Sequence, residues 1–381
     1  MCPNGVEWKT LGEVGTFFNG VTGKSKKDFD NGNAKFISYM NVFSNPKLKI
    51  DVDDTIQINE GEKQNTLQYG DVIFTTSSET PDESGMSSVL TTHTDEKIYL
   101  NSFCFGFRFN NLEIISPDFY SYIFRSERLR NQIIKCANGV TRFNISKASF
   151  AKVKIPLPPL AIQTRIVEIL DHFTNLTANL TAELNLRRKQ FEHYREKLLS
   201  LDGVEGVEWK KLGEVAENLD SKRKPITSSN RVSGDIPYYG ASGIVDYVDG
   251  FIFDGDYLLI SEDGANLLSR NTPIAFSISG KTWVNNHAHI LYFEKQFCRK
   301  FVEYYINKID LTPYISDGAQ PKLNQANLNR ISIPYPSEDT QHSIVSILDK
   351  FTALIVNIEK ELALRQKQYE YYREELLRFG G

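Results

Sequence analysis

A long apolar stripe that occurs twice in the chain constrains its fold more than any other feature. Apolar or aromatic side chains recur every three or four residues, which is the spacing of one face of an α-helix. The first copy consists of Ile166, Ile169, Phe173, Leu176, Leu180, Leu184, Phe191, Tyr194 and Leu198. Adding 178 to each number gives the second copy, Ile344, Ile347, Phe351, Leu354, Ile358, Leu362, Tyr369, Tyr372 and Leu376. Prolines at 156, 158 and 159, and again at 334 and 336, stop the preceding segments and mark where the helices begin.

Each stripe predicts a helix that needs a partner. The segment from 166 to 198 would span roughly 50 Å as an α-helix, and a helix of that length with one apolar face is stable only when the face is covered. We therefore expect helices over 157–201 and 334–381 to form a coiled coil with each other. Arg187, the polar residue of the first stripe, recurs as Arg365. These arginines either lie beside the seam with their head groups in water, or break the coiled-coil register or face a partner subunit.

The segments that precede the helices share a duplicated frame. GVEWKTLGEV at 5–14 returns as GVEWKKLGEV at 206–215, with nine of ten residues identical at an offset of 201. Because the helices repeat at an offset of 178, the second insert is shorter by the difference, 23 residues. The predicted layout is a globular unit over 1–156, a helix over 157–201, a globular unit over 202–333 and a helix over 334–381. The middles of the two units share almost no residues, which suggests two readers of different targets on one scaffold.

Both units are expected to mix strands and helices, which makes the chain an α+β protein. Apolar runs bounded by turn residues predict strands at 35–40, 70–76, 87–90 and 97–109, and at 236–240, 243–253, 256–264, 273–279 and 287–293. Mixed polar and apolar segments predict one helix at 117–136 and another at 298–309.

The reach of the chain predicts that the two long helices are antiparallel. The second GVEW begins five residues after Leu201, and the second helix begins where the second unit ends. A unit of about 130 residues has a radius of gyration of roughly 14 Å, so its ends do not easily lie as far apart as the two ends of the helix. We therefore expect the second helix to run back along the first, with one globular α/β unit at each end of the coiled coil and a pseudo-twofold axis between them. The expected pairs are Ile166–Leu376, Phe173–Tyr369, Leu180–Leu362, Leu184–Ile358, Phe191–Phe351 and Leu198–Ile344, although a slip of seven residues also fits the pattern.

Composition excludes several classes of protein. The formal net charge of -4 argues against a protein that coats nucleic acid by bulk charge, so a nucleic-acid site would be a local surface or one shared with a partner. The four cysteines, Cys2, Cys104, Cys136 and Cys298, have no paired spacing and indicate reduced intracellular thiols. No run approaches 18 apolar residues and the first residues are not typical of a signal peptide, so we expect a cytoplasmic protein without a membrane span.

The motifs at the ends of the repeats resemble those of the specificity subunit of type I restriction-modification systems. GVEW-x-x-LGEV opens each unit, I-P-x-P and Q-x-x-I-V-x-I-L-D lead into each helix, and Y-R-E-x-L-L closes it. The resemblance covers the whole chain, including its duplicated plan. One departure is Ser337-Glu338-Asp339 in place of Pro159-Leu160-Ala161, which concerns only how the second helix begins.

This resemblance implies a non-catalytic subunit of a larger complex. The two globular units would be target recognition domains, each reading one half of a bipartite double-stranded DNA target. The helices would set the spacing and dock two methyltransferase subunits, and restriction subunits would join the assembly. S-adenosylmethionine, ATP and Mg would be used in other subunits, so no cofactor is expected here. The chain also lacks the (N/D)PP(Y/F) motif of amino-methyltransferases. Independently, a protein with twofold-like symmetry reads half-sites about one DNA turn apart, ~34 Å, and a rigid rod would fix that distance.

Candidate DNA contacts lie in loops. Lysines and arginines that could neutralise phosphates are Lys24, Lys26 and Lys27 in the first unit and Lys222, Arg223 and Lys224 in the second, where ordinary solvated loops are an equal alternative. Polar groups that could reach base edges are Asn41, Thr75, Ser77 and Ser78 in the first unit and Tyr238, Tyr239, Ser242, Asn266, Arg270, Asn285, Asn286 and His287 in the second. Each of these alone is also a common turn or strand-end residue. Arg142 and Lys322 are favoured because the matching segments GVTRFN and GAQPKLN both keep a cation.

Other functions have weaker support in the sequence. Pro81-Asp82 followed by Asp95-Glu96-Lys97 matches a short nuclease pattern, but acidic residues are common and this match is best interpreted as accidental. His287 and His289 have the spacing of two metal ligands on one strand face, yet no third ligand is evident, so no metal site is predicted. No nucleophile motif or glycine-rich phosphate loop is present. The main competing class is a coiled-coil scaffold whose globular ends bind protein rather than DNA.

Overall fold

The computed structural model describes residues 5–29, 31–316 and 321–380, so Cys2 and part of the GAQPKLN segment lie outside the described residues. Contacts divide the chain into two compact units. Unit 1 consists of Met1–Leu180 and Glu361–Gly381, and unit 2 consists of Thr181–Lys360. Each unit therefore contains one globular part and half of each long helix. Within the described ranges, no helix is both long and apolar enough to cross a membrane.

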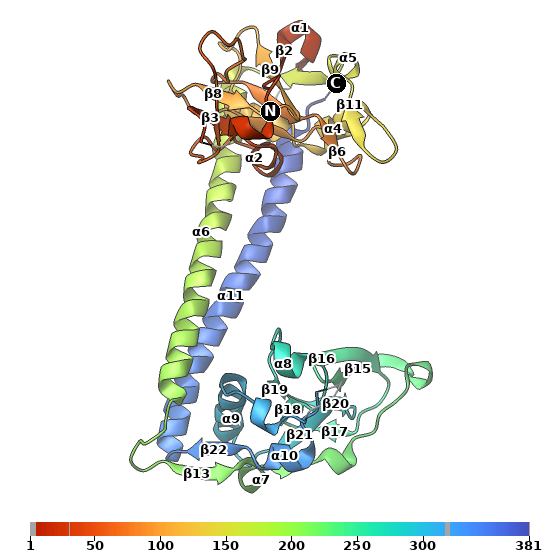
Figure 1. Ribbon diagram of the computed structural model, residues 1–381. Coiled ribbons are helices and arrows are strands. Elements are labelled where there is room, and N and C mark those ends of the chain that lie inside the picture. The colour runs from red at the N-terminus through yellow and green to blue at the C-terminus, as the bar shows by residue number, and fades with distance from the viewer. Residues whose placement is uncertain (1–4, 30, 317–320, 381) are drawn as a thin grey trace. The chain divides into compact units, whose positions relative to one another are not determined.

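Unit 1 contains short strands and helices that precede the first long helix (Figure 1). Its strands are β1 Glu7–Thr10, β2 Gly15–Asn19, β3 Ala34–Ile37, β4 Thr55–Ile56, β5 Val72–Thr75, β6 Ser77–Ser78, β7 Ser87–Val89, β8 Ile98–Leu100, β9 Cys104–Phe109, β10 Ala137–Asn138, β11 Phe143–Ile145 and β12 Lys154–Leu157. Its helices are α1 Leu11–Val14, η1 Lys26–Phe29, α2 Tyr39–Ser44, α3 Pro117–Ile123, α4 Glu127–Ile134 and α5 Lys147–Phe150, and the long α6 Leu160–Leu199 begins in this unit and ends in unit 2.

Unit 2 has a similar series of elements. Its strands are β13 Glu208–Lys211, β14 Glu217–Asn218, β15 Ser233–Gly240, β16 Gly243–Val248, β17 Phe253–Asp254, β18 Tyr257–Ser261, β19 Ala275–Ile278, β20 Lys281–Val284, β21 Ala288–Tyr292 and β22 Ser332–Tyr335. Its helices are α7 Leu212–Val215, η2 Asp220–Lys222, η3 Ser228–Asn230, α8 Asn266–Ser269, α9 Gln296–Lys308, η4 Thr312–Tyr314 and α10 Gln325–Asn329, and the long α11 Glu338–Leu377 begins in this unit and ends in unit 1.

The two units share the order and direction of their main strands although their middle sequences differ. An antiparallel sheet has the order β2-β9-β5-β7 in unit 1 and β14-β21-β18-β19 in unit 2. In a second sheet, a parallel pair (β3 with β8, or β15 with β20) is joined by an antiparallel strand, β4 or β16. The repeated frame therefore extends through the sheets, where the sequence no longer shows it.

In each unit, the strand that contains GVEW pairs with the strand that contains I-P-x-P, and these are the motifs that the two repeats share most closely. In unit 1 β1 is antiparallel to β12, with Trp8 opposite Pro156. In unit 2 β13 is antiparallel to β22, with Trp209 opposite Pro334. The GVEW and I-P-x-P motifs thus form a two-stranded sheet at the start of each long helix.

Buried glutamines at equivalent positions fix the beginnings of the long helices. Gln163 and Gln341 have no exposed side-chain surface. Each donates from Nε2 to a proline carbonyl five residues earlier, Pro158 at 2.8 Å and Pro336 at 2.9 Å. In α11 the hydroxyl of Ser337 accepts from the backbone of Thr340 at 3.3 Å, so serine caps a helix that proline precedes in the first copy. The replacement of Pro159-Leu160-Ala161 by Ser337-Glu338-Asp339 in the second copy therefore changes only how the helix is capped.

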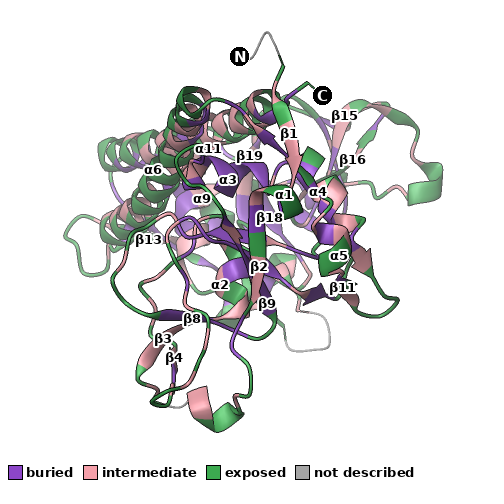
Figure 2. Cartoon of the chain, turned by 90° about the horizontal axis from the view of Figure 1, so that it is seen from above, coloured by how far each residue is buried: buried purple, intermediate pink, exposed green. Residues whose placement is uncertain are grey.

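The apolar stripes form the seam between α6 and α11, which lie side by side (Figure 1). In unit 1 Phe173 stacks on Tyr372 with ring centroids 5.5 Å apart, and in unit 2 Tyr194 stacks on Phe351 at 5.2 Å. Early residues of one helix thus meet late residues of the other in each unit, which confirms the antiparallel direction. The twelve residues predicted at the interface are all buried or half-buried, whereas much of the rest of both helices is exposed (Figure 2).

Two of the predicted ring pairs are wrong by three residues. Phe173 stacks on Tyr372 instead of Tyr369, and Phe351 stacks on Tyr194 instead of Phe191. Phe191 instead contacts Tyr304 of α9, with centroids 6.2 Å apart. The reason is that Phe191 is needed to cover the globular core of unit 2. The remaining four pairs stay predictions.

Three local predictions also differ from the structure. The strand expected at 35–40 ends at Ile37, and a helix begins at Tyr39. The helix expected at 117–136 is two helices, α3 and α4, and between them the Ser126 hydroxyl donates to the Ile123 carbonyl at 2.7 Å. The strand expected at 97–109 is broken between β8 and β9, where the Asn101 side chain accepts from the Phe103 backbone at 2.8 Å and so closes a turn. Cys104, Cys136 and Cys298 are buried free thiols, as expected.

Candidate nucleic-acid interface

A hollow of about 330 Å³ on unit 1 collects several of the predicted base-reading residues. Its lining residues are Tyr39, Met40, Phe43, Ser77, Ser78, Glu79, Glu83, Phe103 and Arg142. We refer to it as the Arg142 hollow. Ser77 and Ser78 form β6, which pairs with β11 directly after Arg142. The fold therefore brings Arg142 close to Ser77 and Ser78, which lie about 65 positions earlier in the chain.

The apolar side of the Arg142 hollow is made by aromatic residues held in fixed positions. Tyr39 stacks on Phe43 with ring centroids 5.9 Å apart, and the Tyr39 hydroxyl donates to the Ser77 carbonyl at 2.9 Å. Phe103 lies at the Asn101 turn and remains 60% exposed, and Met40 is 59% exposed. Exposed apolar side chains such as these can contact thymine methyl groups or insert between bases.

Charge in the Arg142 hollow suits base edges better than phosphates. Glu83 accepts from the hydroxyls of Ser78 at 3.3 Å and Thr80 at 2.9 Å, so its carboxylate is held in place beside the exposed Arg142. A carboxylate repels phosphate but can accept from the cytosine amino group, and arginine can donate two bonds to guanine. The sequence did not indicate six of the residues that line the hollow, because their shared surface appears only after folding: Tyr39, Met40, Phe43, Glu79, Glu83 and Phe103.

The three lysines that follow the first GVEW have different environments. The side chain of Lys24 is 5% exposed, and its ammonium is bound by Glu62 and by the Gln57 carbonyl, both at 2.6 Å. The bond from Lys24, followed by those from Asn59 and Gln64, lowers the pKa of Glu62 to about 2. Lys26 and Lys27 are exposed. Lys26 also lines a second hollow of about 640 Å³, here the Lys26 hollow, which shares Tyr39 and Phe103 with the first.

Asn41 and Thr75 are engaged inside unit 1. Asn41 binds the backbone of Lys49 through both ends of its amide, at 2.7 and 3.2 Å. Thr75 has no exposed surface and accepts from the Met86 backbone at 2.9 Å. Both residues support loops beside the hollows, and neither joins the candidate surface.

A polar surface on unit 2 collects four exposed predicted residues. Asn286 and His287 lie in the turn before β21, and Ser242 lies in the turn between β15 and β16. These turns are neighbours because the Asn285 backbone donates to Tyr239 at 3.0 Å. The backbone of Lys322 forms an isolated antiparallel β-bridge with that of Asp263. The carboxylate of Asp263 lies 2.9 Å from His287 Nδ1. We name the set Ser242, Asn286, His287 and Lys322 the unit-2 surface.

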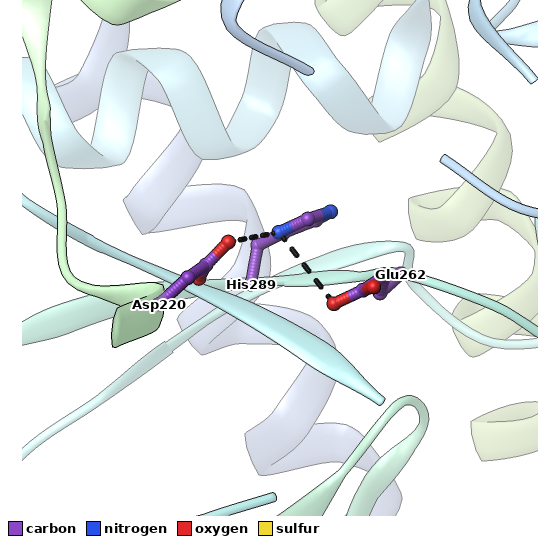
Figure 3. A group of neighbouring side chains, drawn as sticks. All are labelled: Asp220, Glu262 and His289. Atoms are coloured by element: carbon purple, nitrogen blue, oxygen red, sulfur yellow. Dashed lines mark hydrogen bonds and ion pairs between the residues drawn. The ribbon is translucent and has the colours of Figure 1, made fainter. Parts of the chain in front are cut away.

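Beneath this surface lies a buried charge network around His289 (Figure 3). His289 Nδ1 lies 2.5 Å from Asp220, and Nε2 lies 2.7 Å from the Leu323 carbonyl. Both ring nitrogens of His289 thus face oxygen atoms inside unit 2. Arg223 and Lys322 bind Glu262 at 2.6 and 3.1 Å.

These cations hold both carboxylates in the charged form. Burial acts to raise the pKa of Asp220, but the bond from His289 and its charge more than offset this and leave that pKa below its ordinary value. For Glu262, burial is likewise outweighed by Arg223, His289 and Lys322, so its pKa is also lowered.

The same group is the only cluster of three potential metal ligands found among the described residues. Sequence reasoning found no third ligand for His287 and His289, whereas the structure separates these two histidines and places Asp220 and Glu262 with His289. Because positive side chains already occupy both carboxylates, a metal ion would have to displace them. Asp82, Asp95 and Glu96 do not assemble into a comparable cluster in the described ranges, and Glu96 pairs with Lys35 at 2.5 Å.

The other predicted residues of unit 2 are partly internal. The side chain of Arg223 is 12% exposed and its guanidinium is bound in the network. Tyr238 is 1% exposed. Asn266 binds the Thr272 backbone at both ends of its amide, and Asn285 accepts from the His287 backbone at 2.8 Å. Tyr239 and Arg270 are half-buried, while Lys222 and Lys224 are exposed.

Arg142 and Lys322 do not occupy the same strand position. The helices that follow them, α5 and α10, are capped by the side chains of Ser146 and Asn324. These caps are 178 residues apart, so Lys322 corresponds to Asn144, two residues after Arg142. Both segments keep a cation, as expected from the sequence, but at positions of the repeat that differ by two residues. What the units share is a cation near the loop that follows the central strand, β5 or β18.

A family model described as "Type I restriction modification DNA specificity domain" matches residues 3–186 and 204–365, so one copy covers each repeat. The chain belongs to this family. Its curated relatives include a putative type I restriction enzyme specificity subunit of Haemophilus influenzae, which is 44% identical over 192 residues, 48% of this chain and 49% of that protein. A type I restriction enzyme specificity subunit of Escherichia coli is 34% identical over 267 residues, 62% of this chain and 65% of that protein. The matches therefore span about half to two thirds of these curated relatives.

Solved structures of the same family share the fold. The S subunit of a type I restriction-modification system from M. genitalium superposes with a TM-score of 0.62 at 18% identity, covering 100% of this chain and 98% of that chain. The HsdS subunit from Thermoanaerobacter tengcongensis gives a TM-score of 0.52 at 18% identity and covers 98% and 96%. At this identity the likeness concerns the fold alone.

Proposed function

We propose that this chain is the DNA-recognition subunit of a type I restriction-modification complex and that each unit reads one half of a bipartite DNA target. The observation that carries the proposal is that one order of main strands presents two different surfaces. The Arg142 hollow is apolar and aromatic with a cation and two acids, whereas the unit-2 surface is made of amide, hydroxyl, imidazole and ammonium groups. Two surfaces of different chemistry on a duplicated frame suit an asymmetric split sequence.

The long helices would hold the spacing and dock two copies of a methyltransferase subunit. Leu186 and Leu364 are separated by the helix offset of 178 and are 63% and 62% exposed. Beside them, Arg187 binds Glu183 and Gln190, and Arg365 binds Glu361 and Gln368. Both arginines thus lie along their own helix, and the same surface occurs twice. Two equal surfaces suit two copies of one partner, and restriction subunits would join that assembly.

In this proposal the chain performs no catalysis and holds no cofactor of its own. S-adenosylmethionine, ATP and Mg would be used by the partner subunits. The net charge of -4 suggests that tight DNA binding needs those partners. The complex would act in the cytoplasm, where its DNA target resides.

Selection from a pool of random duplexes by the assembled complex tests this function. We expect the selected sequences to contain two short fixed blocks separated by an unread gap. Arg142→Ala should relax one block and weaken binding to it by about tenfold to a hundredfold, the range for losing one base-reading arginine. Lys152→Ala, which removes an exposed cation outside the Arg142 hollow, is the matched control.

The competing function is a scaffold whose globular parts bind protein. Exposed apolar residues such as Met40 and Phe103 also occur at protein interfaces. A scaffold of this kind predicts that no sequence is enriched over the random pool. That outcome would overturn the DNA-reader proposal.

A further inference from the structure

A tyrosine and an aspartate are hydrogen-bonded at the same place in both units. In unit 1 the hydroxyl of Tyr122, on α3, donates to Asp171 of α6. In unit 2 the hydroxyl of Tyr304, on α9, donates to Asp349 of α11 at 2.6 Å. The two aspartates are 178 residues apart, so they are equivalent positions of the duplicated helices.

A threonine one turn later completes each arrangement. Thr174 and Thr352 are again 178 apart, and their hydroxyls donate to the carbonyls of Leu170 at 2.9 Å and Leu348 at 3.0 Å. Thr352 Oγ1 lies 3.2 Å from the Tyr304 hydroxyl. Burial and then the bond to aspartate raise the pKa of Tyr122 and of Tyr304. Both phenols therefore remain protonated donors near neutral pH.

These contacts join the globular part of each unit to its own half of a long helix. The surroundings are apolar, because Phe119 and Ile123 of α3 share one core with Ile166 of α6. In unit 2, Phe301 and Val302 of α9 share the other core with Ile344 of α11. Apolar packing has no preferred direction, so it permits small rotations and slides. A hydrogen bond requires a defined distance and angle, and it therefore selects one position.

The tyrosine–aspartate pair of unit 1 has an additional cation beside it. Lys47 Nζ lies 2.7 Å from Asp118 of α3 and 3.1 Å from Asp171 of α6. One ammonium thus bridges the globular part and the helix beside the tyrosine bond. The helices that supply the tyrosines differ in length and sequence, α3 having 7 residues and α9 having 13. The tyrosine–aspartate pair is present in both units in spite of this divergence.

We propose that the two clamps, Tyr122–Asp171–Thr174 and Tyr304–Asp349–Thr352, are positioning devices that make the spacer length of the split target strict. Each clamp fixes the angle at which a recognition unit sits on its helix. A unit that rocks on its helix would accept half-sites that are displaced by one base pair, and a clamped unit rejects them. This inference rests on the proposed function.

The test uses the complete complex in a host that carries target sequences with the native gap and with gaps one base pair shorter and longer. The variants are Tyr122→Phe and Tyr304→Phe, which remove only the hydroxyl. Methylation is then mapped at base resolution. We expect the same bases to be read, while methylation at the altered gaps relative to the native gap rises on the order of tenfold, the factor expected when one charge-assisted hydrogen bond no longer penalises displacement.

Tyr120→Phe is the matched control, because it removes a buried tyrosine bond of 2.9 Å to the Pro156 carbonyl without touching a clamp. Thermal unfolding of each variant measures the general loss of stability. The inference is overturned if the ratio between gaps is unchanged in both clamp variants, or if the control raises it equally. Should the unaltered complex methylate no split motif at all, the proposed function itself fails, which is a different result.

Discussion

Lys24 and Lys26 are two positions apart, yet they have different roles in unit 1. Lys24 forms a partly buried ion pair with Glu62, whereas Lys26 is exposed and lines the Lys26 hollow. A pattern of basic residues after GVEW indicates a possible phosphate contact but does not distinguish these two environments. The same holds for Arg223, whose guanidinium is bound by Glu262, and for the exposed Lys222 beside it.

Separate substitutions of Lys24 and Lys26 should show that the first residue contributes to the stability of the fold and the second to DNA binding. Lys24→Ala leaves Glu62 without its partner, and we expect a lower unfolding temperature with no selective change in DNA affinity. Lys26→Ala should leave the unfolding temperature unchanged, weaken binding to all sequences about equally and reduce the salt slope by about one. Calorimetry and binding titrations of the assembled complex at several salt concentrations would measure both. Equal destabilisation by both variants would contradict this division.

The carboxylates around His289 give unit 2 a specific sensitivity to acid. The pKa values of Asp220 and Glu262 are lowered from 3.8 and 4.5 in the folded state. A lowered folded-state pKa means that the unfolded chain binds protons more readily, so the stabilisation is present above the unfolded pKa and is lost as pH falls through the folded one.

We therefore expect the unfolding temperature to fall as pH is lowered below about 4. Asp220→Asn should destabilise the chain at neutral pH and make its stability less dependent on acid. Asp235→Asn, at an exposed position, is the control and should behave as the unaltered chain. Thermal unfolding followed between neutral pH and strong acid provides the measurement. A pH dependence of Asp220→Asn that equals that of the control would count against the network.

At the scale of elements, the repeated stripe was sufficient to predict two long helices, and the short reach of the chain between them was sufficient to predict that they are antiparallel. Their exact pairing was less predictable, because Phe191 also covers the core of unit 2 and so contacts Tyr304. The break between α3 and α4 was likewise missed. Arg125, which follows α3, donates to the carbonyls of Val42, Phe43 and Ser87, and these contacts lie too far away in the chain to be read from a local pattern.

Engineered cysteines would determine the pairing in unit 1. The ring contact predicts that Cys substitutions at Phe173 and Tyr372 form a disulfide under mild oxidation faster than substitutions at Phe173 and Tyr369. Disulfide formation requires Cα atoms within about 7 Å, so the rates compare the two distances directly. Faster crosslinking of the second pair would favour the pairing first expected from the sequence.

For the whole molecule, the sequence predicts the frame better than the surfaces. GVEW, I-P-x-P and the stripes could be recognised because they are duplicated, and they form the same sheet and helix starts in both units. The Arg142 hollow instead combines residues near 40, 80, 103 and 142, which only the folded sheets bring together. Its aromatic residues and glutamates carry no motif, so their role follows from the structure alone.

The central claim is that this chain selects the sites that a partner methyltransferase modifies. Base-resolution mapping of methylation in a host with and without the chain, the methyltransferase subunit being present in both, tests it most directly. We predict a split motif with methylated adenines on opposite strands that disappears when the chain is absent. Methylation that is identical in both hosts would contradict the claim and favour a protein scaffold.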